Sequence, residues 1–181
     1  MERPRERQNE AQRREQPSTS GDGQLTLLEE MVAGAVGGLV GGLVMTGAMT
    51  MGEKMGIVER PLPLRVERWA EEQAGMAAET SAEQEKLLGQ GMHLVYSGLL
   101  GAGYGALRSA LDASAIPSGP LYGLSVYALN LGAVLPALDL TKGPWQEEPT
   151  TAGRRLMMHL AFGMAAGLVS EKVRARMADQ G

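Results

Sequence analysis

Four long stretches of the chain carry no charged residue, and they dominate its pattern of hydrophobic and polar positions. These stretches are 31–52, 87–107, 113–138 and 156–170. A soluble helix needs a polar stripe along one side, whereas a charge-free run of about 20 residues is typical of a membrane span. The pattern predicts an all-α fold, an integral membrane bundle of four transmembrane helices over about 31–52, 87–107, 116–138 and 155–172.

The fourth span is the shortest of the four. Its uncharged residues reach about 22 Å as a helix, less than the hydrocarbon layer of roughly 30 Å. We expect the long side chains that flank it to snorkel outward and extend its usable length. A buried or half-inserted helix is the alternative interpretation. The flanking residues are Arg154, Arg155, Lys172 and Arg174.

The polar segments differ from one another in their patterns. Residues 1–24 mix Arg and Glu with Gln, Ser, Pro and Gly and show no apolar periodicity, so we expect a disordered polar tail. The four-helix membrane domain then covers 25–178. Between the first two spans, the apolar residues of 64–78 recur at helical spacing. This spacing predicts a surface amphipathic helix, with Trp69 at the level of the lipid headgroups.

Glycine is abundant, and its positions are regular. Of the 25 glycines, 18 lie inside the four charge-free stretches, and the first span holds two interleaved series of them. Small residues four positions apart let helix backbones approach closely, so we interpret the two series as one flat packing face. We expect such faces to pack the helices and to support self-association. The predicted packing residues are Gly34, Gly37, Gly38, Gly41, Gly42, Ser97, Gly101, Gly105, Gly163 and Gly167.

The second and fourth spans share a short pattern, namely His-Leu, one variable residue, an aromatic residue and a small residue. It begins at His93 and again at His159, and Gly101 and Gly167 follow at matching distances. We infer a two-span hairpin used twice, which predicts parallel repeats about an axis along the membrane normal. In that alignment the two histidines lie at similar depth on one side of the bilayer.

The order of these features resembles the YagU-like family of bacterial inner-membrane proteins. The likeness rests on the block from His93, on the glycine-rich span that ends in Gly143-Pro144-Trp145, and on His159-Leu160 with a basic tail; it extends over about 31–176. The resemblance implies a multi-pass inner-membrane protein of unknown activity, loosely associated with acid tolerance, and no catalytic residues come with it. The glutamate-rich segment 53–86 and the tail 1–24 depart from the family pattern.

His93 and His159 are the only histidines, and both fall inside predicted spans. An ionisable group within a span is a functional candidate, and imidazole titrates near physiological pH. Three interpretations stay open: interfacial or interhelical hydrogen bonding, a protonation switch, and axial ligation of a haem by both imidazoles. Asn130 must find a partner in hydrocarbon. The candidate pH-sensing or polar cluster is His93, His159, Asn130, Tyr96 and Tyr127.

Composition excludes several classes of function. The chain has no cysteine and therefore no disulfide or thiolate chemistry. Its net charge is −4, and it has no basic, aromatic-interleaved patch, so we expect no nucleic-acid partner. No carboxylate lies inside a span to complete a zinc site. Because no nucleophile, base and orienting group cluster in the sequence, we expect no enzyme, no resident cofactor and no metal.

These observations lead to a function in a bacterial inner membrane. The first hypothesis is a non-enzymatic multi-pass protein, self-associating or bound to a membrane-protein partner, and responsive to pH or acid stress. The second is a subunit of a small oligomeric channel or transporter, and the third is a membrane redox protein with bis-histidine haem. Basic residues divide almost evenly between the two sides. The resemblance of the basic tail to that of the family then favours cytoplasmic termini.

Overall fold

The computed structural model describes residues 25–56, 62–73, 75, 81–111 and 113–180, and these residues form helices and turns without a strand. The all-α prediction is confirmed for this part of the chain. The predicted disordered tail 1–24 lies outside the described residues. The helices are α2 (Leu27–Lys54), α3 (Leu62–Gln73), α4 (Ala82–Leu111), α5 (Ala115–Leu129), a π-helical segment (Asn130–Val134), α6 (Leu135–Ala137), a 3-10 turn (Pro144–Gln146) and α7 (Pro149–Ala178).

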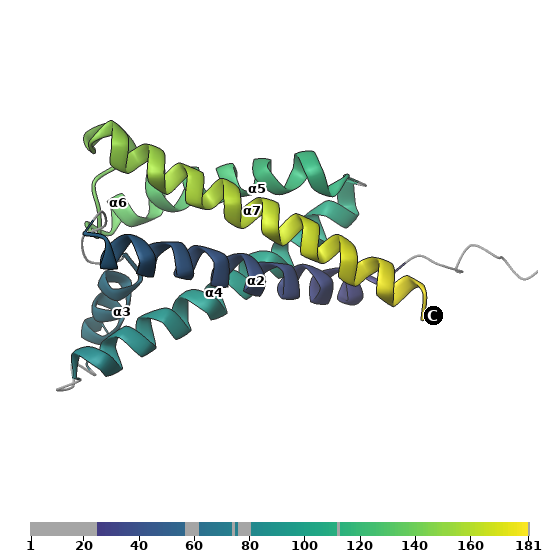
Figure 1. Cartoon of the computed structure of the whole chain (residues 1–181), viewed down its shortest axis with the longest axis horizontal. Helices are drawn as coiled ribbons and strands as arrows, with labels where there is room; N and C mark the ends of the chain where they lie inside the picture. The colour runs from purple at the N-terminus through teal and green to yellow at the C-terminus, as the bar shows by residue number, and fades with distance from the viewer. Residues whose placement is uncertain (1–24, 57–61, 74, 76–80, 112, 181) are drawn as a thin grey trace, which may run out of the picture.

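Four long helices run antiparallel to their sequence neighbours (Figure 1). Helix α2 packs against both α4 and α7, α7 also packs against α5, and the short α3 lies on α4. The chain therefore closes a ring in the order α4, α2, α7, α5. The start of α2, the α4–α5 turn and the C-terminus share one end of the molecule, and α3 and α6 lie at the other (Figure 1).

The sequence explains where several of these helices begin and end. Thr26 and Glu29 form a reciprocal capping box at the start of α2, and Ser81 and Gln84 form the same arrangement before α4. The predicted amphipathic helix 64–78 corresponds to α3, which ends earlier than expected, at Gln73. Gly75 follows with a φ of 64°, a left-handed conformation that terminates a helix.

Two helical segments are long and apolar enough to cross a membrane by length and composition, namely α2 and residues 115–137. The second segment is helical throughout, because the π-helical turn joins α5 to α6 without a break. Helices α4 and α7 are equally long, at 30 residues each, and both carry charged residues toward their ends.

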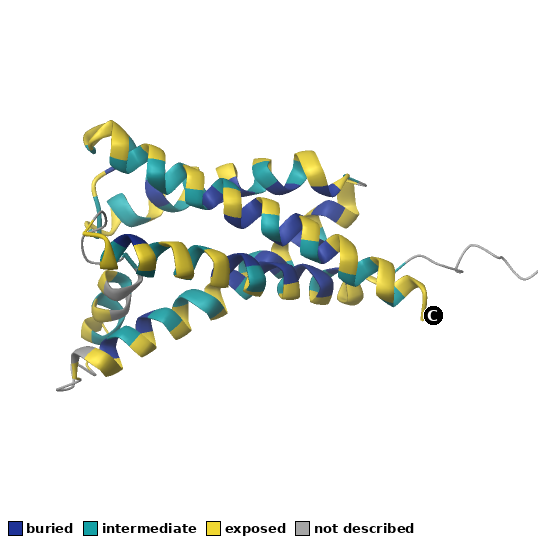
Figure 2. Cartoon of the chain, in the orientation of Figure 1, coloured by how far each residue is buried: buried dark blue, intermediate teal, exposed yellow. Residues whose placement is uncertain are grey.

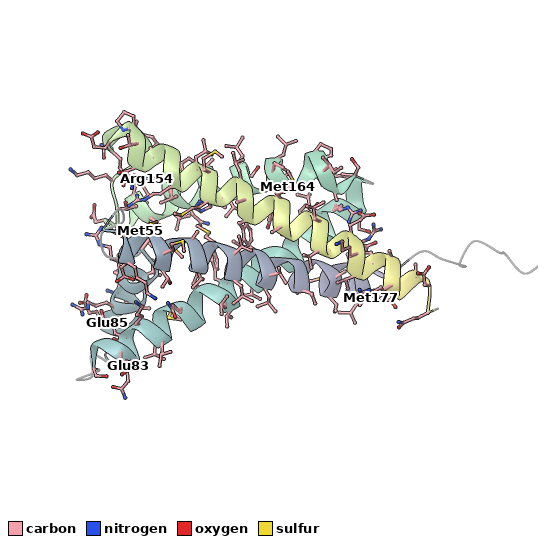
Figure 3. All side chains as sticks on the ribbon, viewed as in Figure 1. Met55, Glu83, Glu85, Arg154, Met164 and Met177 are labelled. Carbon is pink, nitrogen blue, oxygen red and sulfur yellow. The ribbon has the colours of Figure 1, made fainter. Side chains whose placement is uncertain are left out.

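The outer surface of the bundle is apolar on all four long helices. Large hydrophobic side chains stand exposed along each of them, as Met164 does on α7 (Figures 2 and 3). The buried side chains include few large apolar groups and several polar or charged ones. Exposed apolar residues of this kind are Leu39 and Leu43 on α2, Val95 and Leu99 on α4, Leu121 and Leu124 on α5, and Met157 and Leu168 on α7.

The glycines of α2 form two packing faces, where the sequence analysis expected one. A Cβ on Gly38 would lie 2.7 Å from the Cα of Gly101 on α4, whereas a Cβ on Gly41 would lie 2.8 Å from the Phe162 carbonyl oxygen on α7. Each series of α2 meets a different neighbour, because residues offset by three positions point about 60° apart on a helix. Gly34, Gly38 and Gly42 face Ser97, Gly101 and Gly105 of α4, while Gly37 and Gly41 face α7.

The α5–α7 crossing is built like the α2–α4 crossing. Gly119 and Gly123 of α5 meet the backbone of α7 at His159, Gly163 and Gly167. Matching the two crossings by these contacts pairs Gly101 with Gly163 and Ser97 with His159. The predicted alignment of His93 with His159 is therefore displaced by about one helical turn. A shift of four residues keeps small residues on the same face, so the sequence pattern did not fix the register.

Candidate functional site

Two pairs of polar side chains lie in the half of the bundle nearer α3 and α6, one pair between α2 and α4 and the other between α5 and α7. Thr46 of α2 shares a hydrogen bond with His93 of α4, with 3.0 Å between Oγ1 and Nδ1. Tyr127 of α5 and His159 of α7 make an edge-to-face contact with ring centroids 5.4 Å apart. The two imidazoles lie close enough for their charges to interact. We call these four residues the polar tetrad.

His159 is the most firmly held member of the polar tetrad. It is buried, and its Nδ1 donates to the carbonyl of Arg155 at 2.7 Å, one turn earlier in α7. That bond assigns the proton to Nδ1 and leaves Nε2 as the basic nitrogen. Glycine lets α7 approach α5 closely here, because a Cβ on Gly123 of α5 would collide with the His159 carbonyl oxygen. Backbone packing thus fixes where this imidazole lies.

A hydrogen bond between α4 and α5 lies beside the polar tetrad. Tyr96, one turn after His93, donates from its hydroxyl to Oδ1 of Asn130 at 2.9 Å. Asn130 lies one turn after Tyr127 and opens the π-helical segment, in which the backbone N–H of Leu135 bonds the Asn130 carbonyl. Single-turn π segments inside helices are frequent at functional sites. We call the Tyr96–Asn130 pair the latch.

The five residues predicted as a polar cluster therefore gather in one region, as two tetrad histidines, one tetrad tyrosine and the latch. Thr46 was missed, because a single threonine in an apolar span carries no signal in the sequence. Tyr127 also donates to the Ala152 carbonyl at 3.3 Å, which ties α5 to the start of α7. Arg155, one turn before His159, forms an ion pair with Glu147, which joins α7 to the segment before it at this end of the bundle.

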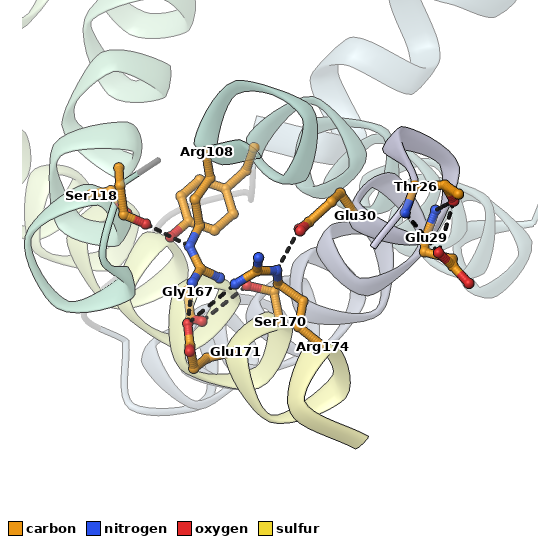
Figure 4. A network of polar contacts seen from close by, with 11 residues as sticks. Thr26, Glu29, Glu30, Arg108, Ser118, Gly167, Ser170, Glu171 and Arg174 are labelled. Carbon is orange, nitrogen blue, oxygen red and sulfur yellow. Dashed lines mark hydrogen bonds and ion pairs between the residues drawn. The ribbon is translucent and has the colours of Figure 1, made fainter. Parts of the chain in front are cut away.

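A second polar cluster lies at the opposite end, where the N-terminus of α2 and the C-terminal half of α7 meet (Figure 4). Glu30 of α2 pairs with Arg174 of α7 at 2.5 Å, and Arg108 of α4 pairs with Glu171 of α7. Glu30 is 3% exposed and Arg108 is 6% exposed. We call these four residues the ionic cluster. The expectation that Arg174 snorkels outward is wrong, because a buried carboxylate holds it inside.

Local hydrogen bonds fix the geometry of the ionic cluster. Arg108 donates from Nε to the Ala113 carbonyl at 2.8 Å, which ties the end of α4 to the turn before α5. Ser170, fully buried next to Glu171, donates to the Gly167 carbonyl at 3.0 Å. Two cations and two carboxylates balance in charge, as buried ions require. This arrangement joins three helices and leaves no net charge to attract a ligand.

The chemistry available at the polar tetrad is the gain and loss of protons. Each imidazole uses its Nδ1 in a hydrogen bond, His93 with Thr46 and His159 with the Arg155 carbonyl. Across the residues that the structure describes, no group of three or more His, Asp or Glu side chains is arranged to hold a metal ion.

Comparison of the chain with models of protein families, with curated proteins and with solved structures found no match. The resemblance to the YagU-like family stays a prediction that rests on the residues quoted for it.

Proposed function

We propose that this chain is a non-enzymatic, multi-pass protein of a bacterial inner membrane that responds to pH through His93 and His159. In this proposal α2, α4, residues 115–137 and α7 all cross the bilayer, as two parallel hairpin repeats with cytoplasmic termini. The observation that carries the proposal is the polar tetrad, in which His93 bonds Thr46 between α4 and α2 and His159 contacts Tyr127 between α7 and α5.

The distribution of side chains supports a lipid environment for all four helices. Large apolar side chains face outward on each of them, while serine, histidine, arginine and glutamate are buried. Soluble proteins rarely expose apolar surface this extensive, and glycine-packed interiors are typical of membrane bundles. The charged ends of α4 and α7 then lie at the headgroup level, where the ionic cluster closes one end of the bundle.

Protonation of the polar tetrad would change the forces between the helices. If both imidazoles were protonated, two like charges would lie near each other. The Arg155 guanidinium would add a third positive charge close to His159. Tyr127 adds a neutral phenol from α5, and Thr46 adds a hydroxyl from α2. Glu147 is the acidic group nearby, and it pairs with Arg155. Like charges in a low-dielectric interior repel strongly, so acidification would drive α4 and α7 apart.

The test is the double variant His93→Gln/His159→Gln, purified in detergent and in lipid nanodiscs. We expect wild-type protein to change its hydrogen-exchange protection around residues 90–100 and 123–131 between pH 7.5 and 5, and the double variant to lose that change. Glu83→Gln, at an exposed position of α4 away from the polar tetrad, is the matched control and should keep it. An undiminished change in the double variant would disprove the pH response through these residues. A Soret band in the absorption spectrum of wild-type protein would instead support bis-histidine haem.

The self-association expected from the sequence needs a different surface. The glycines predicted to mediate it are buried between helices of one chain, so a second copy has no access to them. Among the helical glycines, Gly47, Gly91 and Gly153 have open space around them. Homo-oligomerisation and a membrane-protein partner stay predictions.

A small oligomeric channel is the second candidate function, and one observation favours it. Polar contacts continue from the latch toward the ionic cluster, through Tyr122 to the Leu100 carbonyl and through Tyr104 to Ser118. We expect proton or ion flux in vesicles loaded with a pH-sensitive dye if the chain forms a conducting oligomer. A strict monomer without flux would disprove this candidate and leave the pH response intact.

A further inference from the structure

Three hydrogen bonds from tyrosine hydroxyls connect α4 and α5. Tyr96 donates to Asn130 at 2.9 Å, Tyr122 donates to the Leu100 carbonyl at 2.7 Å, and Tyr104 and Ser118 share a hydrogen bond of 2.8 Å. Close backbone approaches between α4 and α5 are far fewer than between the other packed pairs of long helices. We call this interface the tyrosine seam.

The corresponding interface on the other side of the ring is built from small residues. Matching the two helix crossings by their glycine contacts pairs α2 with α5 and α4 with α7, so α2–α7 is the counterpart of α4–α5. Gly37 of α2 then corresponds to Tyr122, and Ala166 of α7 corresponds to Tyr104. At α2–α7 a Cβ on Gly37 would lie 3.1 Å from the Ser170 nitrogen, with the Ala166 carbonyl closer still. We call this interface the glycine seam.

The two seams respond differently to a force that separates helices. When two helix backbones in direct contact separate, they lose dispersion attraction along the whole contact. Glycine has no side chain that could extend across the gap and keep part of that contact. Long tyrosine side chains bridge a gap that already exists, and a single interhelical hydrogen bond contributes little to helix association in a membrane. Separation therefore costs less along the tyrosine seam than along the glycine seam.

The polar tetrad lies where separation along the tyrosine seam would uncover it. Tyr96 follows His93 by one turn on α4, and Asn130 follows Tyr127 by one turn on α5, so the latch closes the tetrad on this side. Both latch residues retain access to the surroundings, with Tyr96 44% exposed. The π-helical segment at Asn130 is also a local departure from α-helical geometry that can relax when the latch breaks.

We propose that the bundle opens laterally along the tyrosine seam, with the glycine seam as its hinge, and that this opening exposes the polar tetrad between α4 and α5. The trigger rests on the proposed pH response, whereas the identity of the moving seam does not. Opening would expose the buried His159 and the half-buried His93 as a polar surface at the lipid-facing side of the bundle.

The absence of cysteine from the sequence makes the test direct, because two introduced cysteines can be spin-labelled without background. Val95→Cys with Leu129→Cys reports on α4 and α5, and Val36→Cys with Leu168→Cys reports on α2 and α7; all four positions are exposed. In nanodiscs between pH 7.5 and 5, we expect the first distance to lengthen by about 5 Å, half an interhelical spacing. The second distance should stay unchanged.

Two further variants separate the seam from its trigger. In Tyr96→Phe/Tyr122→Phe the first distance should lengthen already at pH 7.5, because the bonds that hold the seam are gone. In His93→Gln/His159→Gln it should stay short at pH 5. If the histidine variant still opens along α4–α5, the proposal about the tyrosine seam is retained and the proposal that the histidines trigger opening is wrong. If both distances lengthen together, or neither lengthens in wild type and in the phenylalanine variant, the seam proposal is overturned.

Discussion

The glycine seam between α2 and α7 and the tyrosine seam between α4 and α5 occupy equivalent places in the ring, yet they are built from opposite side chains. One brings Gly37 and Gly41 against the α7 backbone. The other spaces its helices with Tyr104 and Tyr122, whose rings lie 5.3 Å apart at an angle of 51°. Two matched interfaces with different side-chain volumes make a bundle that is rigid on one side and separable on the other.

Similar helix crossings do not imply a similar resistance to helix separation. Both hairpins close by glycine contacts, α2 on α4 and α5 on α7, so each hairpin is a stiff unit. What differs is how the hairpins meet. Backbone contact and the Glu30–Arg174 pair join α2 to α7, and phenolic hydrogen bonds join α4 to α5, while the Arg108–Glu171 pair links α4 to α7 at one end. Single substitutions in each seam test whether the two seams differ in their resistance to separation.

Removing the buried carboxylate of the glycine seam should have the largest effect. Glu30→Ala removes the buried carboxylate that pairs with Arg174 between α2 and α7, and breaking a buried ion pair from one side costs about 3 kcal/mol or more. We expect a corresponding loss in the free energy of unfolding, measured by denaturant titration in mixed micelles. Glu83→Ala, at an exposed position of α4, is the control and should change it little.

Adding one methyl group to the glycine seam should come next. In Gly37→Ala the new Cβ would collide with the Ala166 carbonyl and crowd the Ser170 nitrogen. Both are backbone atoms that cannot move without shifting α7, so we expect a destabilisation of about 2 kcal/mol. The same substitution at Gly47, which has open space around it, should be neutral or slightly stabilising. Equal effects at the two positions would show that the seam is not tightly packed.

Much of the fold, and part of the site, could be predicted from the sequence. Charge-free runs located the four long helices, and glycines spaced four apart located their crossings. The sequence singles out His93, His159, Asn130, Tyr96 and Tyr127 as polar groups in apolar stretches, and each of them makes a hydrogen bond or ring contact with another helix. A polar group in such a stretch needs a partner, so polar groups that share a bundle tend to converge.

The rest of the fold depends on which face of each helix packs against which neighbouring helix, and the spacing of residues in the sequence does not decide this. The series at Gly34 and the series at Gly37 look alike in the sequence, although one faces α4 and the other α7. The repeat was misaligned by one turn for the same reason. The pair of Glu30 with Arg174 joins residues far apart in the chain and at the ends of spans, where a charge more often faces water.

The smallest expected effect concerns one hydrogen bond of the tyrosine seam. Tyr122→Phe keeps the ring and its contact with Tyr104 while removing the donor to the Leu100 carbonyl. That carbonyl already accepts within α4, so the loss should be about 0.5–1 kcal/mol in the free energy of unfolding. Hydrogen exchange should rise around 96–104 of α4 while α2 stays protected, because only the separable seam has been weakened. A loss as large as that of Gly37→Ala, with α2 and α7 exchanging faster as well, would mean that the two seams are mechanically alike and that the comparison fails.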